Sequence, residues 1–407
     1  MENLNTGDTA WLLVCCALVL MMTPGLAFFY GGMARRKNVL STLTLSFAFM
    51  ALVGVQWVLY GYSLAFGPDI GGLIGGLNFL GLSGVGPAPN PDYAKTIPHA
   101  LFAAFQMMFA VITPALITGA FVERVRFKSF LLFSLIWITL VYDPLAHWVW
   151  GKGGWLNQLG VLDFAGGTVV HIAAGYSALA FALVIGPRKG FGKFPIEPHN
   201  IPLTVLGTGL LWVGWFGFNA GSALAANGVA VNALLTTNTS AATAALVWML
   251  LSWLDGRPST LGIATGAVVG LAAVTPASGF VSPMAAMVIG AVAAPLCYYA
   301  IRFRQNRALD ESMDVWACHG MASTWGMIAT GLFAAVEFNA AGANGLFYGN
   351  PSQVAIQLLA VAVTIAFTFA VTFVVAKLLD MSIGLRVTGM EEEVGLDISG
   401  HGERAYS

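Results

Sequence analysis

Long apolar runs, separated by short polar segments, make up most of the chain. A helix needs roughly 20 predominantly apolar residues to cross a bilayer, and runs of about this length recur from one end of the sequence to the other. The pattern therefore predicts an all-α polytopic membrane protein. Eleven spans are predicted, over residues 9–31, 39–66, 99–122, 129–150, 163–186, 201–225, 232–254, 260–280, 283–303, 314–336 and 352–380.

The polar segments between these runs are of two kinds, which alternate strictly along the chain. All Lys and Arg residues except Lys95 and Lys152 lie in every second segment or near the C-terminus. Because basic residues gather on the cytosolic side of membrane proteins, we expect the N-terminus outside and the C-terminus inside. The alternation also supports the count of spans, since a missed span would reverse it from that point onward.

The composition agrees with a membrane protein. Hydrophobic residues make up 57% of the chain and charged residues only 9%, whereas soluble domains carry about 25% charge. The formal net charge of −1 argues against a nucleic-acid partner. The four cysteines lie within apolar runs without metal-finger spacing, so we expect buried thiols rather than disulfides. The N-terminus lacks a basic region, and we expect no cleavable signal peptide.

Eleven spans divide into five, five and one. A unit with an odd number of spans begins and ends on opposite sides of the membrane, so a tandem copy is inverted, which is a recurrent transporter design. Asp163 and His171 of the fifth span have counterparts in Asp314 and His319 of the tenth, although the Asp-to-His spacings differ. The predicted parts are a transmembrane domain over 1–380, with repeats about 9–186 and 201–336 and an eleventh helix about 352–380, and a cytosolic tail over 381–407.

His171 and His319 lie well inside predicted spans. Ionisable groups in such places are rare and usually face a bundle interior or a transport pathway. A structural histidine bonded to a neighbouring carbonyl is the alternative, but matching positions in two repeats favour a functional pair. Two histidines without a nearby carboxylate or thiolate make a poor metal site, so we expect no metal and no cofactor. Asp163 and Asp314 are expected to cap helix starts.

Aromatic residues and a serine occur at several span ends. Singly, each aromatic residue is more often part of the core or of the interfacial belt than part of a ligand site. The pattern of apolar positions alone therefore gives these residues no role. They are Phe105 and Phe109, which share one helix face, Trp150 near an outer end, and Trp215, Phe218 and Ser222 within GWFGFNAGSA.

Several motifs together resemble the ammonium transporter family, in its bacterial and archaeal branch of the ammonium/methylammonium/Rhesus group. They extend from the first span to the last residue, so the resemblance covers nearly the whole chain. Cys318 departs from the pattern, because small apolar residues are common before the second histidine. The motifs are FFYGGMARRKN, FQMMFA, GAFVERVRF, AHWVWGKGGWL, LDFAGGTVVHI, GWFGFNAGSA, VTPASG, DVWACHG and GLDISGHGERAYS.

The resemblance implies a homotrimer in the lipid bilayer, with one pore through each subunit and ammonium or methylammonium as substrate. It also implies an ordered tail coupled to a neighbouring subunit, where the usual expectation is a disordered end, and a cytosolic PII (GlnK-type) signal protein that plugs the inner mouth. The resemblance assigns Phe109, Trp150 and Ser222 to an outer recognition site and makes Asp163 an essential acid. It assigns Phe109 and Phe218 to a stacked gate, and His171, His319, Trp215 and Phe105 to the pore.

These residue types suit ammonium, which resembles potassium in size and charge. Aromatic faces attract a cation by about 0.5–2 kcal/mol, and the hydroxyl of Ser222 can accept an N–H bond. A narrow apolar stretch then disfavours the charged form; ammonium can lose a proton there and potassium cannot. Neutral imidazoles donate and accept hydrogen bonds, so they can guide ammonia. We expect selective ammonium uptake across the cell membrane, with NH3 conducted and a proton relayed separately.

Other functions stay open. A sensor with little flux would need an output domain, and no kinase or cyclase follows residue 407. No nucleophile–base set supports an intramembrane enzyme, so we expect none. A channel for another neutral molecule does not need the aromatic and serine residues of the outer site. The sequence does not distinguish an electroneutral ammonia channel, transport of ammonia with a proton, and transport of the intact ion.

Overall fold

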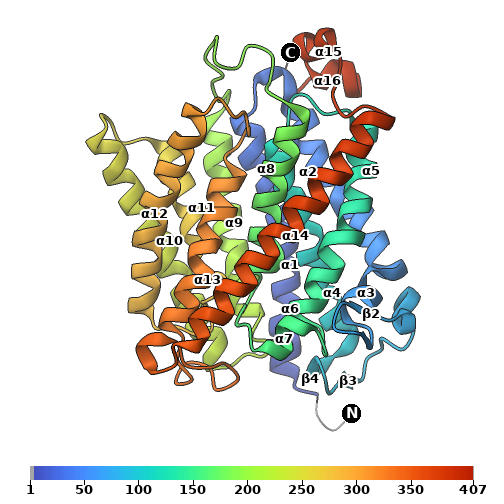
Figure 1. Ribbon diagram of the computed structural model, residues 1–407, viewed down its shortest axis with the longest axis vertical. Helices are drawn as coiled ribbons and strands as arrows, with labels where there is room; N and C mark the ends of the chain where they lie inside the picture. Colours follow the sequence, from blue (N-terminus) through green and yellow to red (C-terminus); the bar gives the residue numbers. More distant parts are fainter. Residues whose placement is uncertain (1–3, 407) are drawn as a thin grey trace.

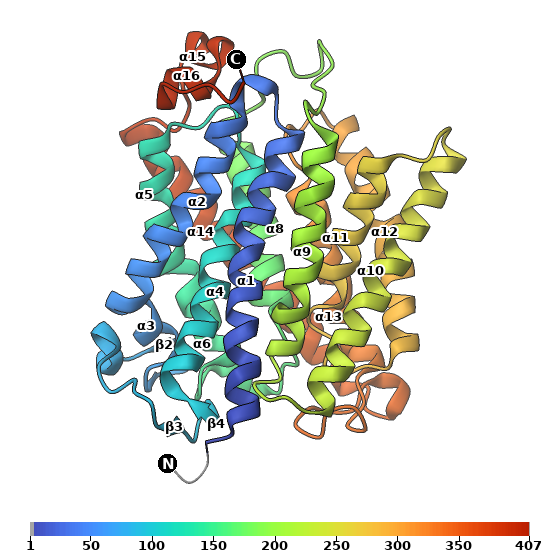
Figure 2. The ribbon, with the colours of Figure 1, turned by 180° about the vertical axis from the view of Figure 1, so that it is seen from behind.

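Helices follow the predicted apolar runs along residues 4–406, the part of the chain that the computed structural model describes (Figures 1 and 2). Residues 1–3 and Ser407 of the predicted domains lie outside this part. The first half contains α1 Thr6–Met33, η1 Arg36–Asn38, α2 Val39–Gln56, η2 Trp57–Gly61, α3 Tyr62–Phe66, η3 Leu77–Leu82, α4 His99–Ile117, η4 Thr118–Ala120, α5 Phe127–Trp137, η5 Ile138–Tyr142, α6 Asp143–Trp150, α7 Trp155–Leu159, η6 Gly167–Ile172 and α8 Ala173–Ile185. The second half contains α9 Ile201–Gly221, α10 Gly228–Leu254, α11 Thr260–Val274, α12 Pro283–Asn306, η7 Trp316–Met321, α13 Ala322–Phe333, η8 Leu346–Tyr348, α14 Ser352–Ser382, α15 Gly389–Val394 and α16 Leu396–His401.

Nine helical segments of residues 4–406 are long and apolar enough to cross a membrane. Two predicted spans are shorter than expected, because 260–280 forms the 15-residue α11 and 314–336 is helical only over Trp316–Phe333. Both lie within the bundle beside the longer helices (Figure 1). A multi-pass helical architecture is therefore present, while the count of eleven crossings stays a prediction.

The two ends of the bundle differ. One end carries α7 and two short hairpins, β1 Asp69–Ile70 with β2 Ile74–Gly75 and β3 Pro89–Asn90 with β4 Ala94–Pro98; we call it the hairpin end. The other carries α15 and α16, and we call it the tail end. The chain begins at the first and finishes at the second (Figures 1 and 2), as an odd number of crossings requires. Which end faces the cytosol stays a prediction from the basic residues.

The two histidine-bearing segments contain π-helical turns. His171 lies in η6 and His319 in η7, and each π turn continues directly into an α-helix. Single π turns within α-helices are frequent at functional sites. Close packing of glycine brings the two segments together, since a Cβ placed at Gly175 would overlap the backbone of Gly320. Small residues thus set the distance between the two histidine helices.

The predicted span 163–186 begins four residues late. Gly166 has φ +115°, a conformation that suits glycine and cannot continue a right-handed helix. Residues 163–166 therefore form a loop, and the helix starts at Gly167. Asp163 lies before the helix rather than in its first turn.

Candidate functional site

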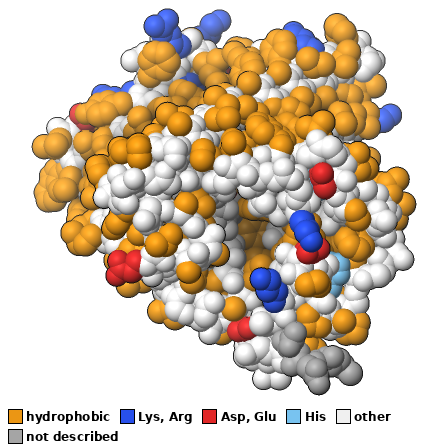
Figure 3. All heavy atoms as spheres, turned by 60° about the horizontal axis from the view of Figure 1, so that its bottom comes forward, with side chains coloured by type: hydrophobic (Ala, Val, Ile, Leu, Met, Phe, Trp, Pro, Cys, Tyr) orange, Lys and Arg blue, Asp and Glu red, His pale blue; other side chains and the backbone are white. Residues whose placement is uncertain are grey.

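A cavity of about 230 Å³ lies near the hairpin end of the bundle. Its lining includes Phe109 of α4, Trp150 of α6 and Ser222, which directly follows α9. The Ser222 hydroxyl donates to the carbonyl of Phe218 at 2.8 Å, so its oxygen remains available to accept a bond. Figure 3 shows this end hollowed, with a few charged side chains beside the hollow. The three residues predicted for recognition are thus together in one cavity.

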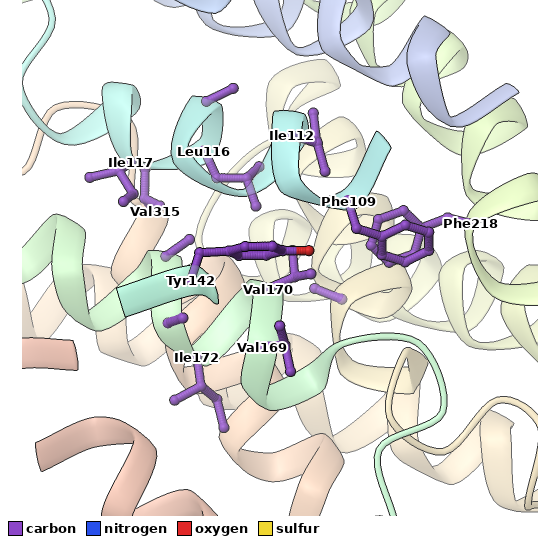
Figure 4. Close-up of a cluster of buried hydrophobic side chains, with 14 of the residues drawn as sticks. Phe109, Ile112, Leu116, Ile117, Tyr142, Val169, Val170, Ile172, Phe218 and Val315 are labelled. Atoms are coloured by element: carbon purple, nitrogen blue, oxygen red, sulfur yellow. The ribbon is translucent and has the colours of Figure 1, made fainter. Parts of the chain in front are cut away.

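Two buried phenyl rings close the cavity on the side of the bundle interior. The centroids of Phe109 and Phe218 are 4.2 Å apart, with an angle of 33° between the ring planes, and Figure 4 shows the two rings against one another. Trp150 meets Phe109 edge-on at 6.0 Å. Phe105 is fully buried with its ring 5.0 Å from that of Phe109, so it supports Phe109 from behind.

Beyond the phenyl pair lies a narrow enclosed void of about 10 Å³. Phe218 forms part of its wall with Trp215, His171 and His319, and the remaining wall is aliphatic, apart from Phe29. A void needs roughly 10–15 Å³ to hold one water molecule, so this space is at the lower limit for a single small molecule. The Trp215 Nε1–H donates to Thr275 Oγ1 at 2.9 Å, which fixes the indole.

The two histidines face each other in this void. Their Nδ1 atoms are 3.3 Å apart, and their rings are nearly parallel, with an interplanar angle of 19°. A hydrogen bond between two Nδ1 atoms requires one to carry the hydrogen and the other to accept it. His171 Nε2 is buried and has no hydrogen-bond partner within residues 4–406. The pair therefore shares one bond and retains unused hydrogen-bonding capacity.

Asp163 holds the start of η6, as capping predicts. Its Oδ1 accepts the backbone N–H groups of Gly166 at 2.8 Å and Gly167 at 2.6 Å, and its Oδ2 accepts that of Thr168 at 2.7 Å. The Thr168 hydroxyl also donates to Oδ2. The Asp163 carbonyl accepts the Trp150 Nε1–H at 3.0 Å. The acid thus connects the wall of the hairpin-end cavity with the π turn that carries His171.

Glu311, which sequence analysis missed, performs the corresponding task at the start of η7. Its carboxylate accepts the N–H groups of Val315 and Trp316 at 3.0 and 3.1 Å. The expected cap, Asp314, instead has φ +58° and pairs with Arg304 at 2.6 Å, so that expectation is wrong. Glu311 precedes His319 by eight residues, the spacing that separates Asp163 from His171. That equal spacing is the signal in the sequence that identifies it.

Glu311 is also electrostatically unusual. It is fully buried, and burial raises its pKa from 4.5 to about 7, although the nearby Arg304 opposes the shift. Two other arginines at the tail end are paired with carboxylates. Arg188 and Asp310 form a buried ion pair at 2.8 Å, and Arg35 pairs with Glu123 at 2.7 Å. These contacts fasten the loops around the tail end of the bundle.

The tail folds back onto this end of the same chain. Thr388 and Glu391 form a capping box at the start of α15, and Asp397 accepts the backbone N–H of Ser41 at 2.8 Å. Lys37 Nζ donates to the carbonyl of Glu392 at 2.8 Å. An ordered tail is therefore present in residues 388–406, while its coupling to a neighbouring subunit stays a prediction.

Comparison with known proteins extends over nearly the whole chain. A sequence model of the Ammonium Transporter Family matches residues 10–406. Ammonium transporter Amt1 of Archaeoglobus fulgidus is 52% identical over 404 residues, which cover 99% of this chain and 100% of that protein. The crystal structure of Mep2 from Candida albicans superposes with a TM-score of 0.90 at 36% identity, covering 96% of this chain and 88% of that one. A solved structure of a sensor Amt protein has a TM-score of 0.89 at 29% identity and covers 97% of this chain and 98% of that one.

Proposed function

The chain belongs to the ammonium transporter family, as its motifs predicted, and on this basis we propose the route by which it carries ammonium across the membrane. NH4+ binds at the hairpin end to Phe109, Trp150 and Ser222. It loses a proton there, and NH3 crosses the bundle past His171 and His319. The proton crosses separately, and the hairpin end faces the cell exterior.

The composition of the hairpin-end cavity supports the binding step. Phe109 and Trp150 offer ring faces to a cation, which are worth about 0.5–2 kcal/mol depending on desolvation. Ser222 adds one acceptor, because its own hydrogen is already donated to Phe218. Potassium would gain from the rings as well, so this cavity concentrates cations without separating the two ions strongly.

The narrowness of the path supports deprotonation before the histidines. A cation entering the void of about 10 Å³ would leave its water behind and meet mostly apolar walls. Moving an unpaired ion into such surroundings is far more costly than moving a neutral molecule. Ammonium avoids this desolvation cost because it loses a proton in the hairpin-end cavity and enters the void as neutral ammonia. Potassium has no proton to lose. Selectivity then follows from acid–base chemistry rather than from ionic radius.

The single observation that carries the proposal is the 3.3 Å approach of the two Nδ1 atoms inside the apolar void. Because the imidazoles bond to each other through Nδ1, the Nε2 atom of His171 is left to bond a passing molecule. Neutral imidazole can act as donor or acceptor according to its tautomer. The pair thus offers ammonia a hydrogen bond without a fixed charge and provides a chain along which a proton can move.

The test is methylammonium uptake by purified protein in liposomes, with His171→Ala, His319→Ala and the double variant. We expect each single variant to impair methylammonium uptake. We expect the double variant to lose the charge movement that accompanies uptake in wild type. Size-exclusion chromatography and thermal stability serve as folding controls. A double variant that transports at the wild-type rate, with charge movement coupled as in wild type, would rule the route out.

We also infer a homotrimer in the cell membrane and a PII (GlnK-type) protein as a partner at the tail end. The support is the family resemblance together with the ordered tail beside the basic loops. Light scattering of the solubilised protein tests the trimer, with a monomer contradicting it. Co-purification of a PII protein that is lost when residues 391–407 are deleted tests the partner.

A sensor that binds ammonium with little flux is the second candidate, because the chain resembles a solved sensor Amt protein. The two functions differ in turnover. Sustained uptake of many substrate molecules per protein supports the transporter. Saturable ammonium binding without uptake in the same liposomes supports the sensor.

A further inference from the structure

We propose that Gln357 of α14 is a positioning residue for transport, because it holds the loop of residues 160–166 and so keeps Asp163 and Trp150 in place beside the hairpin-end cavity. The inference rests on the proposed function, which assigns Trp150 to the binding of ammonium. α14 crosses the bundle obliquely between its two ends (Figure 1). None of its residues, all of which the structure describes, lines either cavity of the route.

The Gln357 side chain makes two hydrogen bonds to the backbone of a single residue, Leu162. Its Oε1 accepts the Leu162 N–H at 2.9 Å, and its Nε2 donates to the Leu162 carbonyl at 2.7 Å. Because an N–H only donates and a carbonyl only accepts, these partners determine which way the amide faces. Gln357 is fully buried. Its two bonds set the orientation of the loop as well as its position.

The loop depends on such partners from outside. Residues 160–166 lie outside any helix, so their backbone groups lack helical partners, and buried N–H and C=O groups need a hydrogen bond. Successive turns of α14 supply some of these bonds. Gln353 Nε2 donates to the Gly160 carbonyl at 3.0 Å, and Gln357 bonds Leu162. The two glutamines are four residues apart and therefore share one face of α14.

The position of Leu162 carries the effect of Gln357 to the site. Leu162 directly precedes Asp163, whose carbonyl accepts the Trp150 Nε1–H at 3.0 Å. The Asp163 carboxylate accepts the first N–H groups of η6, the segment that contains His171. Gln357 thus fixes the residue next to the one that connects Trp150 with the π turn of His171.

The same amide lies against α13, which continues from the π turn of His319. Gln357 Nε2 is 3.4 Å from the Met327 carbonyl, and a Cβ placed at Gly331 would lie 3.2 Å from Gln357 Cγ. This close approach leaves the side chain little room to turn. Gln357 is therefore held against α13 while it holds the loop of residues 160–166.

The experiment compares Gln357→Met, which keeps a similar length and removes both bonds to Leu162, with Thr372→Val as the matched control. Thr372 is buried on the same helix, and its hydroxyl bonds Trp137 and Ser177. It is 15 residues from Gln357, or about 22 Å along the helix. Full-length protein in liposomes gives the KM and maximal rate of methylammonium uptake. Melting temperature and hydrogen exchange of residues 160–168 are measured on the same preparations.

We expect Gln357→Met to raise the KM, because a displaced Trp150 loses its attraction for the cation, a change of about two- to fivefold. Backbone N–H groups of residues 160–168 should exchange faster in this variant. Thr372→Val should keep the wild-type KM and the wild-type exchange of residues 160–168, even where its melting temperature falls as far. A merely structural role for Gln357 would lower the maximal rate and leave the KM unchanged.

An unchanged KM in Gln357→Met, or an equal rise in Thr372→Val, would overturn the proposal. If Gln357→Met does not fold, Gln353→Met, which loses the bond to Gly160, decides by the same comparison, with a smaller rise in KM expected. A wild-type protein without uptake would contradict the proposed function instead. Exchange of residues 160–168 would then decide alone whether Gln357 holds the loop, and equal exchange in Gln357→Met and Thr372→Val would refute it.

Discussion

Removal of the Asp163 carboxylate tests how the site is held together, because the acid carries charge and also caps η6. Four donors converge on its two oxygens: three backbone N–H groups and the Thr168 hydroxyl. Asp163→Ala leaves all four without that partner. A buried donor left unpaired costs about 1–3 kcal/mol, so the gross cost is roughly 4–12 kcal/mol, comparable with the whole stability of many proteins. Asp163→Ala should unwind the π turn and displace His171.

Asp163→Asn separates the cap from the charge. The amide oxygen can still accept from Gly166 and Gly167, and the Thr168 hydroxyl can turn to accept from the amide nitrogen. Only the Thr168 N–H loses its acceptor, at a cost of about 1–3 kcal/mol. We expect Asp163→Asn to lower the melting temperature moderately and to keep measurable methylammonium uptake, while Asp163→Ala loses both. Wild-type stability and uptake in Asp163→Ala would refute the reasoning. Equal inactivity of two well-folded variants would mean that the charge, rather than the cap, is required.

Three further predictions concern other parts of the chain. Asp310→Asn removes the nearer of the two carboxylates that pair with the buried Arg188 and leaves Glu123 at 3.6 Å. Breaking a buried ion pair costs at most about 3–5 kcal/mol, so the melting temperature should fall. Burial alone would raise the pKa of Asp310, but the hydrogen bonds from Arg188 outweigh burial and hold this pKa below 3.8. The stability that the Asp310 carboxylate adds is therefore present above its ordinary pKa and is lost as the pH falls through the lowered pKa. The melting temperatures of wild type and Asp310→Asn should converge in acid, and a difference that does not change with pH would contradict this. Phe218→Ala removes a ring from the wall of the void and should admit potassium, whereas an unchanged potassium current in planar bilayers would show that the ring does not limit access. Deletion of residues 391–407 removes the contacts of Asp397 with Ser41 and of Glu392 with Lys189 and should lower uptake. An unchanged rate would show that the docked tail has no influence on transport.

Most of the helical architecture was accessible from the sequence, because burial in a bilayer imposes length and apolarity on each crossing. The family and the all-α polytopic fold are confirmed. The site residues were assigned by resemblance, and the structure places Phe109, Trp150 and Ser222 around one cavity and His171 and His319 around another. Their roles in transport stay predictions that the experiments above address.

The details that the sequence did not reveal depend on tertiary packing. The π turns arise where the chain accommodates one extra residue per turn, and apolar periodicity does not report this. Asp314 looked like a helix cap, but its left-handed backbone and its pairing with Arg304 give that task to Glu311. The docking of the tail depends on contacts such as Asp397 with Ser41, which are separated by more than 350 residues.

The most direct test of the central claim is to measure current on one preparation of reconstituted protein, first with ammonium and then with potassium at the same concentration. If the substrate gives up a proton before the apolar void and that proton crosses separately, ammonium produces a current, whereas potassium produces no current above that of empty liposomes. A saturable potassium current comparable to the ammonium response would contradict the account, because it would mean that an intact cation passes the phenyl rings and the histidine pair.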